Sequence, residues 1–305
     1  MCGISGWFSQ SALEANADDR LQDMMRAINH RGPDADGKYR GDHVAFGHTR
    51  LSIIDLDSGQ QPMTSTTGNT TIVFNGEIYN YKALRSACEH DGYRFRTSSD
   101  TEVILALFET QGIHAMRRLR GMFAFALWDS AKNEGWLVRD PLGIKPLFFS
   151  HKDQSHLVFA SEAKSIFASG LCQRSLDTGS LHLLMNMRYL PGTQTLFEGV
   201  EQLPAGHALC WKKDGSTRLV PVPAEAAAES PDTVAAIRDS VLHHMVSDVE
   251  VGAYLSGGID SATVVALAGA TTSSPMQTFT LDIGDDPKEA RNAARTAEIL
   301  GVTNT

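Results

Sequence analysis

Two patterns of apolar segments divide the chain, and the change between them constrains the fold more than any other feature. The first pattern is a series of short, strand-like segments at 43–54, 70–77, 122–129, 135–139, 147–150 and 157–161. The second pattern alternates helices at 233–247, 261–270 and 287–300 with strands at 249–255 and 277–283. Strands in series favour antiparallel sheets, whereas βαβ alternation is typical of a parallel sheet. We therefore predict an α+β chain that begins with antiparallel sheets and ends in an α/β unit.

Helices are also predicted among the strands of the first pattern. Apolar residues at helical spacing predict helices over 17–29 and 177–187. A further helix is predicted to begin near Asp100, with Ser99 and Glu102 as a capping box.

The segment over 212–231 separates the two patterns. It contains three prolines and a run of small residues, which indicates a linker. We predict a first domain over 1–210, a linker over 211–231 and a second domain over 232–305. The 305-residue chain stops just after one βαβ unit, and two strands are too little sheet for a stable domain. We therefore expect residues 232–305 to be the opening part of a larger domain.

The composition is that of a globular protein and argues against several other classes. Hydrophobic residues make up 42% of the chain, which is ample material for a buried core. The net charge of −9 argues against a broad nucleic-acid surface. The longest apolar run, 122–128, is far shorter than the roughly 20 residues of a membrane span, and no secretory signal is visible. We expect a cytoplasmic protein that binds neither nucleic acid nor membranes, and a homodimer is left open.

A cysteine stands at position 2, and none of the four cysteines has the spacing of a zinc site or a disulfide framework. Removal of Met1 would give Cys2 both a thiol and a free α-amine. The pKa of an α-amine is about 7.7–8.0, so it can act as the base for its own thiol, as in N-terminal nucleophile enzymes. A chance cysteine is the alternative, and the dipeptide Cys2–Gly3 alone does not decide between the two.

Eight motifs follow one another in order: MCGISG (1–6), HRGPD (30–34), GHTRLSIIDL (47–56), FNGEIYN (74–80), SDTEVIL (99–105), GMFAFALWD (121–129), VRDPLGIKPLFF (138–149) and FASEAKSIF (159–167). Together they resemble the glutaminase domain of the class II glutamine amidotransferases. In order and spacing they are most similar to the glutamine-hydrolysing, B-type asparagine synthetases. The resemblance extends to about residue 283, and it implies an N-terminal nucleophile hydrolase fold, an αββα sandwich of antiparallel sheets.

The resemblance also implies the residues of a glutaminase site. Cys2 would attack the amide of glutamine, while Asn75 and Gly76 would donate hydrogen bonds to the oxyanion that forms. An Asn-Gly pair alone favours a type I′ hairpin turn, but the surrounding motif favours the catalytic interpretation. The guanidinium of Arg50 would bind the α-carboxylate of glutamine, and the carboxylate of Asp100, with Glu77 nearby, would receive the α-ammonium group. The residues expected to bind glutamine are Arg50, Leu51, Ile53, Asn75, Gly76, Glu77 and Asp100. We interpret Asp140, Gly143 and Lys145 as residues that fix a turn between sheets.

A glycine-rich loop, Ser256–Ser261, lies between a strand-like segment and a helical one. This arrangement aims backbone N–H groups and the helix dipole at a bound phosphate, although a plain strand-to-helix turn is the alternative. The Walker A pattern is absent, and SGGIDS instead resembles the pyrophosphate loop of the ATP pyrophosphatases. That resemblance implies an ATP site in which Asp260 helps to hold Mg²⁺. The residues expected to bind ATP are Leu255, Ser256, Gly257, Gly258, Asp260, Ser261 and Leu281.

The two resemblances together imply a glutamine-dependent asparagine synthetase whose cofactors are ATP and Mg²⁺. Ammonia from glutamine would amidate aspartate through an aspartyl-AMP intermediate, giving asparagine, AMP and pyrophosphate. The family's second loop, SGEGADE, does not occur in this sequence, so we expect weak glutamine hydrolysis without asparagine synthesis. Two alternatives stay open: an enzyme of the same architecture that acts on another carboxylate, and a truncated, non-catalytic paralogue used for binding or regulation.

Overall fold

The computed structural model describes residues 1–225, 232–272, 274–281 and 288–305. The chain divides into two compact units, unit 1 over Met1–Glu225 and unit 2 over Ala226–Thr305. We describe each unit by itself.

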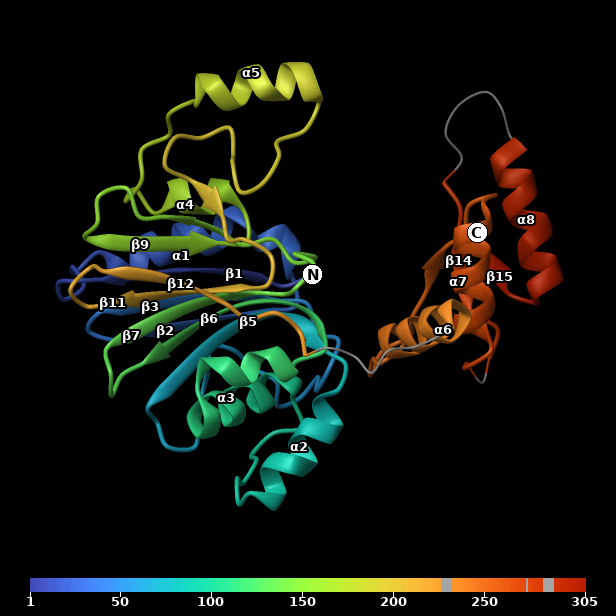
Figure 1. Ribbon diagram of the computed structural model, residues 1–305, viewed down its shortest axis with the longest axis horizontal. Helices are drawn as coiled ribbons and strands as arrows, with labels where there is room; N and C mark the ends of the chain where they lie inside the picture. Colours follow the sequence, from blue (N-terminus) through green and yellow to red (C-terminus); the bar gives the residue numbers. More distant parts are fainter. Residues whose placement is uncertain (226–231, 273, 282–287) are drawn as a thin grey trace. The chain divides into compact units, whose positions relative to one another are not determined.

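Unit 1 contains two six-stranded antiparallel sheets (Figure 1). In spatial order, the first sheet consists of β10 (Glu201–Gln202), β8 (Phe148–Ser150), β9 (His156–Ala160), β1 (Gly3–Ser9), β3 (Val44–Arg50) and β2 (Ala35–Arg40). The second sheet consists of β12 (Thr217–Pro221), β11 (His207–Lys212), β7 (Glu134–Arg139), β6 (Gly121–Asp129), β5 (Thr70–Ile78) and β4 (Met63–Thr64). The predicted antiparallel pairing is confirmed.

An aromatic core fills the space between the two sheets. Phe8 of β1 lies at its centre, with ring centroids 5.9 Å from Trp128 and 5.6 Å from Trp211 of the opposite sheet. Alternate residues of β6, such as Ala124 and Ala126, also join this core, because successive side chains of a strand point to opposite faces. The core therefore holds β1, which follows Cys2 directly, rigidly against the second sheet.

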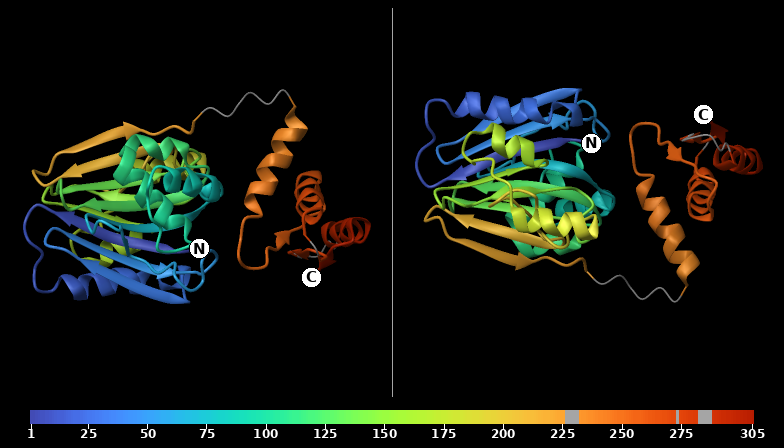
Figure 2. Two further views of the ribbon diagram at one scale, coloured as in Figure 1. Left: turned by 90° about the horizontal axis from the view of Figure 1, so that it is seen from below. Right: turned by 90° about the horizontal axis from the view of Figure 1, so that it is seen from above.

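Helices cover the outer face of each sheet. The first sheet is covered by α1 (Ala17–Ala27), the 3₁₀-helix η1 (Asn29–Arg31) and α4 (Ala163–Ala168). In both views of Figure 2, α1 lies on the outer side of the blue strands. The second sheet is covered by α3 (Asp100–Gln111), with α2 (Tyr81–His90) and the 3₁₀-helix η2 (Ile113–Arg118) packed against α3. These four layers confirm the predicted αββα sandwich.

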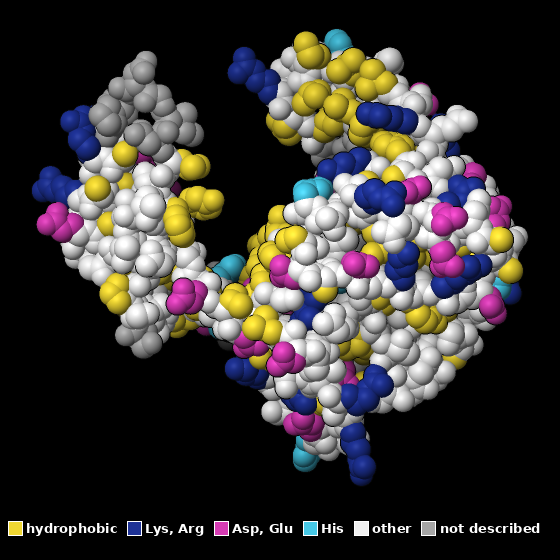
Figure 3. Space-filling model, turned by 180° about the vertical axis from the view of Figure 1, so that it is seen from behind, with side chains coloured by type: hydrophobic (Ala, Val, Ile, Leu, Met, Phe, Trp, Pro, Cys, Tyr) yellow, Lys and Arg dark blue, Asp and Glu magenta, His cyan; other side chains and the backbone are white. Residues whose placement is uncertain are grey.

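The remaining helix of unit 1, α5 (Thr178–Met187), stands away from the sandwich. Apolar side chains gather on the surface over this helix (Figure 3). Among them, Met185 is 76% exposed and Tyr189 is 57% exposed.

Two local predictions need correction. The predicted boundary at 210 and residues 211–225 of the predicted linker fall inside unit 1, where β11 and β12 form a hairpin at the edge of the second sheet. Residues 226–231 of that linker lie outside the described residues. The predicted capping box is half right: the Ser99 side chain accepts from Thr101 N–H, but Glu102 accepts from the N–H groups of Arg96 and Thr97.

Unit 2 is a small α/β unit with a parallel sheet in the order β13-β14-β15, which confirms the predicted parallel pairing. Its elements are α6 (Thr233–His244), β13 (Ala253–Tyr254), α7 (Ile259–Gly269), β14 (Gln277–Phe279), α8 (Lys288–Leu300) and β15 (Thr303–Asn304). The strands are shorter than predicted, and residues 282–283 of the second predicted strand lie outside the described residues. No helix in the described parts of either unit is long and apolar enough to cross a membrane.

Candidate active site

A pocket of about 200 Å³ in unit 1 brings together residues that are distant in the sequence. Its walls include every residue predicted for the glutamine site: Cys2, Arg50, Leu51, Ile53, Asn75, Gly76, Glu77 and Asp100. They come from the residue before β1, the end of β3 and the loop after it, the C-terminal half of β5, and the first residue of α3. The sandwich therefore places both sheets and one helix N-terminus around a single cavity.

Cys2 directly precedes β1, which pairs with β3 and β9 and is fixed on both sides. The Cys2 sulfur lies 3.4 Å from the backbone N–H of Leu51, which donates to it. Burial raises the pKa of the Cys2 thiol, while the hydrogen bond from Leu51 and the charges of Arg50 and Lys145 act in the opposite direction. The pocket thus contains groups that favour a thiolate at a partly buried position.

Asn75 and Gly76 lie within β5, where they pair with Ala124 and Phe123 of β6. The alternative of a hairpin turn at this dipeptide is therefore wrong. Asn75 is 1% exposed, and among the described residues its Nδ2 atom has no hydrogen-bond partner. A buried amide donor that faces a pocket without a partner is suited to bind an oxygen atom of a ligand.

Gly76 is required by the close approach of β6. A Cβ atom at this position would lie 2.2 Å from the carbonyl oxygen of Met122 and 2.7 Å from the Cα of Phe123. Any larger residue would push β5 away from β6 and move Asn75 with it.

Arg50, the last residue of β3, is 4% exposed and organises the loop that follows it. Its guanidinium donates to the carbonyl oxygens of Ile54, Asp55 and Leu56 at 3.3, 2.6 and 3.2 Å. These bonds use three of the five N–H groups, so by the contacts within the described residues two remain for a ligand in the pocket. The side chain can therefore hold the loop and still meet a carboxylate.

Asp100 begins α3 and is 4% exposed. Its carboxylate accepts from the backbone N–H of Ile78 at 2.9 Å. Burial raises the pKa of Asp100 to about 7 and the charge of Glu77 adds to this effect, although the N–H of Ile78 acts in the opposite direction. A carboxyl group with such a pKa gains most from a cationic ligand, because a positive charge restores its ionised form.

The pocket also contains residues that the sequence did not single out. Gln61 lies in its wall, and its Oε1 accepts from the backbone N–H of Phe74 at 2.6 Å. The carbonyl oxygen of Phe74 lies 3.1 Å from Nε2 of His48, and burial lowers the pKa of this histidine to about 4. His48 is therefore neutral and donates through Nε2. The residue before Asn75 is thus held at both of its backbone polar groups.

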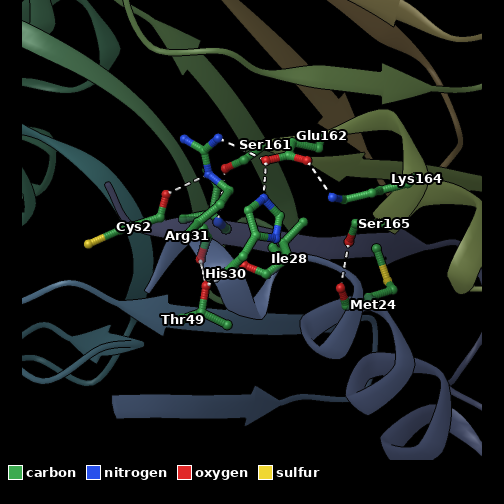
Figure 4. A network of polar contacts seen from close by, with 12 residues as sticks. Cys2, Met24, Ile28, His30, Arg31, Thr49, Ser161, Glu162, Lys164 and Ser165 are labelled. Atoms are coloured by element: carbon green, nitrogen blue, oxygen red, sulfur yellow. Dashed lines mark hydrogen bonds and ion pairs between the residues drawn. The ribbon is translucent and has the colours of Figure 1, made fainter. Parts of the chain in front are cut away.

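A second group of residues fixes Cys2 from outside the pocket (Figure 4). Arg31 Nε donates to the backbone carbonyl of Cys2 at 3.0 Å, and Arg31 Nη1 lies 3.0 Å from Glu162 Oε1. His30 and Lys164 also contact Glu162, at 2.9 and 3.0 Å. Burial alone would raise the pKa of Glu162, but the hydrogen bonds from Arg31, Lys164 and His30 lower it to about 2. The motifs HRGPD and FASEAKSIF contain these residues, but only the fold brings them together.

In unit 2, the predicted glycine loop follows β13 and leads into α7. Ser261 Oγ lies 3.1 Å from the backbone N–H of Ser256, which donates to it, and it donates to the carbonyl of Gly258 at 3.1 Å. Leu255 is buried and pairs with Phe279 through its backbone N–H. The loop therefore has a defined shape at the carboxyl end of the parallel strands, where α/β sheets bind ligands.

The other residues predicted for ATP are less closely grouped. Leu281 is 67% exposed, and Asp260 is exposed in the first turn of α7. A cavity of about 860 Å³ in unit 2 is lined by residues near 249–252, 271–272 and 274–279 and does not include the loop. This cavity lies at the opposite, amino-terminal edge of the strands, so we assign it no role in nucleotide binding.

Asp260 can supply one carboxylate to a magnesium ion. Within the described ranges no cluster of three or more His, Cys, Asp or Glu residues could hold a metal by itself. Mg²⁺ is commonly held by one or two carboxylates together with substrate phosphates, so a single aspartate beside a phosphate-binding loop fits this ion.

The sandwich and the pocket define a class of protein. The chain belongs to the glutamine amidotransferase family, because the family model described as a glutamine amidotransferase domain matches residues 1–220. Residues 233–305 match the family model described as asparagine synthase.

Individual proteins support the same assignment. The chain is 39% identical over 316 residues to the glutamine-hydrolyzing asparagine synthetase 1 of Bacillus subtilis, which covers 100% of this chain and 49% of that protein. It is 34% identical to the amidase chry2 of Gibberella zeae, over 99% of this chain and 50% of that protein. The chain thus spans about half the length of the curated relatives it matches.

A solved structure supports the fold. The glutamine phosphoribosylpyrophosphate amidotransferase of B. subtilis, in complex with ADP and GMP, matches with a TM-score of 0.53 at 18% identity. The match covers 100% of this chain and 65% of that one. This likeness confirms the predicted N-terminal nucleophile hydrolase fold.

Proposed function

We propose that unit 1 hydrolyses glutamine to glutamate and ammonia, with Cys2 as the nucleophile. The observation that carries this proposal is the single pocket that gathers a thiol, an unpartnered amide donor, an arginine and two carboxylates. These groups match glutamine part by part: the thiol meets the side-chain amide, Arg50 meets the α-carboxylate, and Asp100 with Glu77 meets the α-ammonium group.

The proposed reaction begins with removal of Met1, which gives Cys2 a free α-amine. This amine takes the thiol proton, and the sulfur attacks the amide carbon, so that the carbonyl electron pair moves to oxygen. Nδ2 of Asn75 and the backbone N–H of Gly76 donate to that oxyanion. The protonated amine then gives its proton to the leaving nitrogen, and ammonia departs. Water attacks the glutamyl thioester, releases glutamate and restores the thiol.

We propose further that the ammonia serves an ATP-dependent amidation in which unit 2 takes part, with aspartate as the acceptor and asparagine as the product. The match of residues 233–305 to the asparagine synthase model and the resemblance to asparagine synthetases support this proposal. The loop Ser256–Ser261 would hold the phosphates of ATP. Leu255 and Leu281 would lie near the adenine base, and Asp260 would help to hold Mg²⁺. A bound Mg²⁺ would neutralise phosphate charge. The proposed setting is the cytoplasm, and a homodimer stays open.

A second candidate differs only in the acceptor. The amidase chry2 is also similar over almost the whole chain, which shows that this architecture occurs in proteins with other names than asparagine synthetase. In a chain extended to the full length of these relatives, incubation with ATP, glutamine and a panel of carboxylates that includes aspartate distinguishes the two candidates, because the amide product identifies the acceptor.

Glutamate release is the test of the proposed hydrolysis. We expect Cys2→Ala to abolish glutamate release from glutamine, whereas Cys172→Ala, at a partly buried thiol outside the pocket, keeps it. If the Cys2→Ala variant released glutamate at the wild-type rate, the nucleophile would be another group. If neither the wild-type protein nor the Cys172→Ala variant released glutamate, a non-catalytic binding role would be supported instead.

A further inference from the structure

Lys145 is a buried cation in the wall of the glutamine pocket. It is 5% exposed and lines the cavity together with Cys2 and Glu77. Lysine is almost never fully buried unless it is paired. Its place in the fold is the loop from β7 to β8, which crosses from the second sheet to the first.

The loop is built around the carboxylate of Asp140, which is completely buried. This carboxylate accepts backbone N–H bonds from Leu142, Ile144 and Lys145 at 2.9–3.0 Å, and from Phe123 at 3.2 Å. Asp140 therefore holds the backbone N–H of Lys145 from one side. The turn that the sequence predicts is present.

Arg139 holds the other side of the same loop. Its Nε donates to the carbonyl of Lys145 at 2.8 Å, and its Nη2 donates to the carbonyl of Gly143 at 2.7 Å. Gly143 has a φ of +67°, a conformation that glycine adopts without strain. Both backbone polar groups of Lys145 are thus fixed, which sets the point from which its side chain reaches the pocket wall.

We propose that Lys145, whose backbone is held by the Asp140 turn, is a functional residue of the glutamine pocket and that its ammonium group stabilises the Cys2 thiolate before the thiolate attacks the amide. The inference rests on the proposed glutaminase reaction and adds to it a residue that balances the negative charge of sulfur. Arg50 also acts on the thiol, but its N–H groups hold the loop after β3.

The positive charges around the site favour the thiolate form of Cys2. Although burial raises the pKa of the Cys2 thiol, Lys145 lowers it, as do Arg50 and the Met1 α-amine. Burial lowers the pKa of Lys145 itself, whereas Glu77, Cys2 and Asp140 raise it and Arg31 lowers it further. Burial likewise lowers the pKa of the Met1 α-amine, Cys2 and Glu77 raise it, and Lys145 and Arg31 lower it further. A cation at this position therefore favours both a thiolate and an unprotonated amine.

Alkylation of Cys2 by iodoacetamide, followed at its peptide by mass spectrometry from pH 6 to pH 10, tests the proposal. The thiolate alone reacts, so the rate reports its fraction. In Lys145→Met we expect the midpoint to rise by about one pH unit and the rate at neutral pH to fall about tenfold. Lys145→Arg should keep most of the wild-type profile, and Lys152→Met, at an exposed lysine, should keep all of it.

A purely structural Lys145 predicts a different result. Glutamine turnover would fall in Lys145→Met while its alkylation profile matched the wild-type one, and this outcome would overturn the proposal. If Lys145→Met did not fold, Lys145→Gln would replace it as the neutral variant, with the same expected shift. The alkylation profile does not require turnover, so a shifted profile in a protein that releases no glutamate would refute the proposed function and keep the role of Lys145.

Discussion

At the scale of single residues, Asp100 connects pH to substrate binding. Burial raises its pKa to about 7, and the α-ammonium group of glutamine needs an ionised carboxylate. We therefore expect the KM for glutamine to fall as pH rises through about 7, and to depend little on pH above 8. Steady-state glutamate release from pH 5.5 to pH 8.5 measures this. Asp100→Asn should show a higher KM that no longer falls over this range, and a falling KM in this variant would exclude Asp100.

The same carboxyl group should make stability depend on pH. Its folded pKa is raised above the unfolded value of 3.8, so its contribution to the free energy of unfolding is fully present below about pH 4 and is lost as pH rises through about 7. Asp100→Asn removes this loss. As pH rises from 5 to 8, we expect the free energy of unfolding of Asp100→Asn to increase by roughly 2–4 kcal/mol relative to that of the wild type.

Tryptophan fluorescence during urea unfolding can measure this difference for unit 1 alone. All four tryptophans belong to that unit: Trp7, Trp128, Trp136 and Trp211. A difference between variant and wild type that stayed the same at pH 5 and pH 8 would contradict the raised pKa of Asp100.

Asn75 is expected to act only when charge develops on the substrate oxygen. We expect Asn75→Ala to lower kcat about 10²–10³-fold with little change in KM. Asn69→Ala, at an exposed asparagine before β5, serves as the matched control and should leave both constants unchanged. A large rise in KM with an unchanged kcat in Asn75→Ala would assign Asn75 to ground-state binding instead.

At the scale of elements, the β5–β6 pair carries the oxyanion donors. A Cβ at Gly76 would lie 2.2 Å from the carbonyl oxygen of Met122, which is impossible without separating the two strands. We expect Gly76→Ala to lower the free energy of unfolding of unit 1 by about 1–3 kcal/mol and to reduce kcat as well. Urea unfolding and glutamate release measure the two effects. Wild-type values of both would show that β5 can shift without affecting Asn75.

The elements also show what the sequence could predict. Strands such as β5 and β6 were predictable from their apolar β-branched and aromatic residues, and the start of α3 from Ser99. The helix α2 and strand β15 were not predicted. Strand β12 falls in the predicted linker, because Pro221 at its end and the prolines that follow obscure an edge strand.

The site was predictable only through motifs that resemble a family. Composition and periodicity say nothing of which loops meet, so the contacts of Gln61 and His48 with Phe74, and of Arg31 with Cys2, had no signal of their own. Lys145 could be placed in a turn from its motif, but its burial beside Cys2 depends on how the loop crosses between the sheets. The roles of the pocket residues stay predictions.

At the scale of the whole molecule, unit 1 is a glutamine amidotransferase sandwich, and unit 2 matches part of the asparagine synthase family. The two units differ in sheet type, and each carries its own proposed site: a thiol pocket between antiparallel sheets and a phosphate loop after a parallel strand. Release of ammonia and its use in an amidation are therefore expected to be separable by mutation. Asp260→Asn should weaken the binding of ATP with Mg²⁺, measured by calorimetry, and leave glutamate release unchanged, and loss of both would contradict this division.

In the proposed reaction Cys2, as the N-terminal residue, forms a covalent thioester with the glutamyl group of glutamine. Intact-mass spectrometry of the protein, quenched with acid during turnover, tests it most directly. We predict a chain that lacks Met1 and carries the mass of one γ-glutamyl group, with peptide mapping to Cys2, and we predict no such adduct in Cys2→Ala. A chain that retains Met1 and never carries the adduct, although it releases glutamate, would contradict the account.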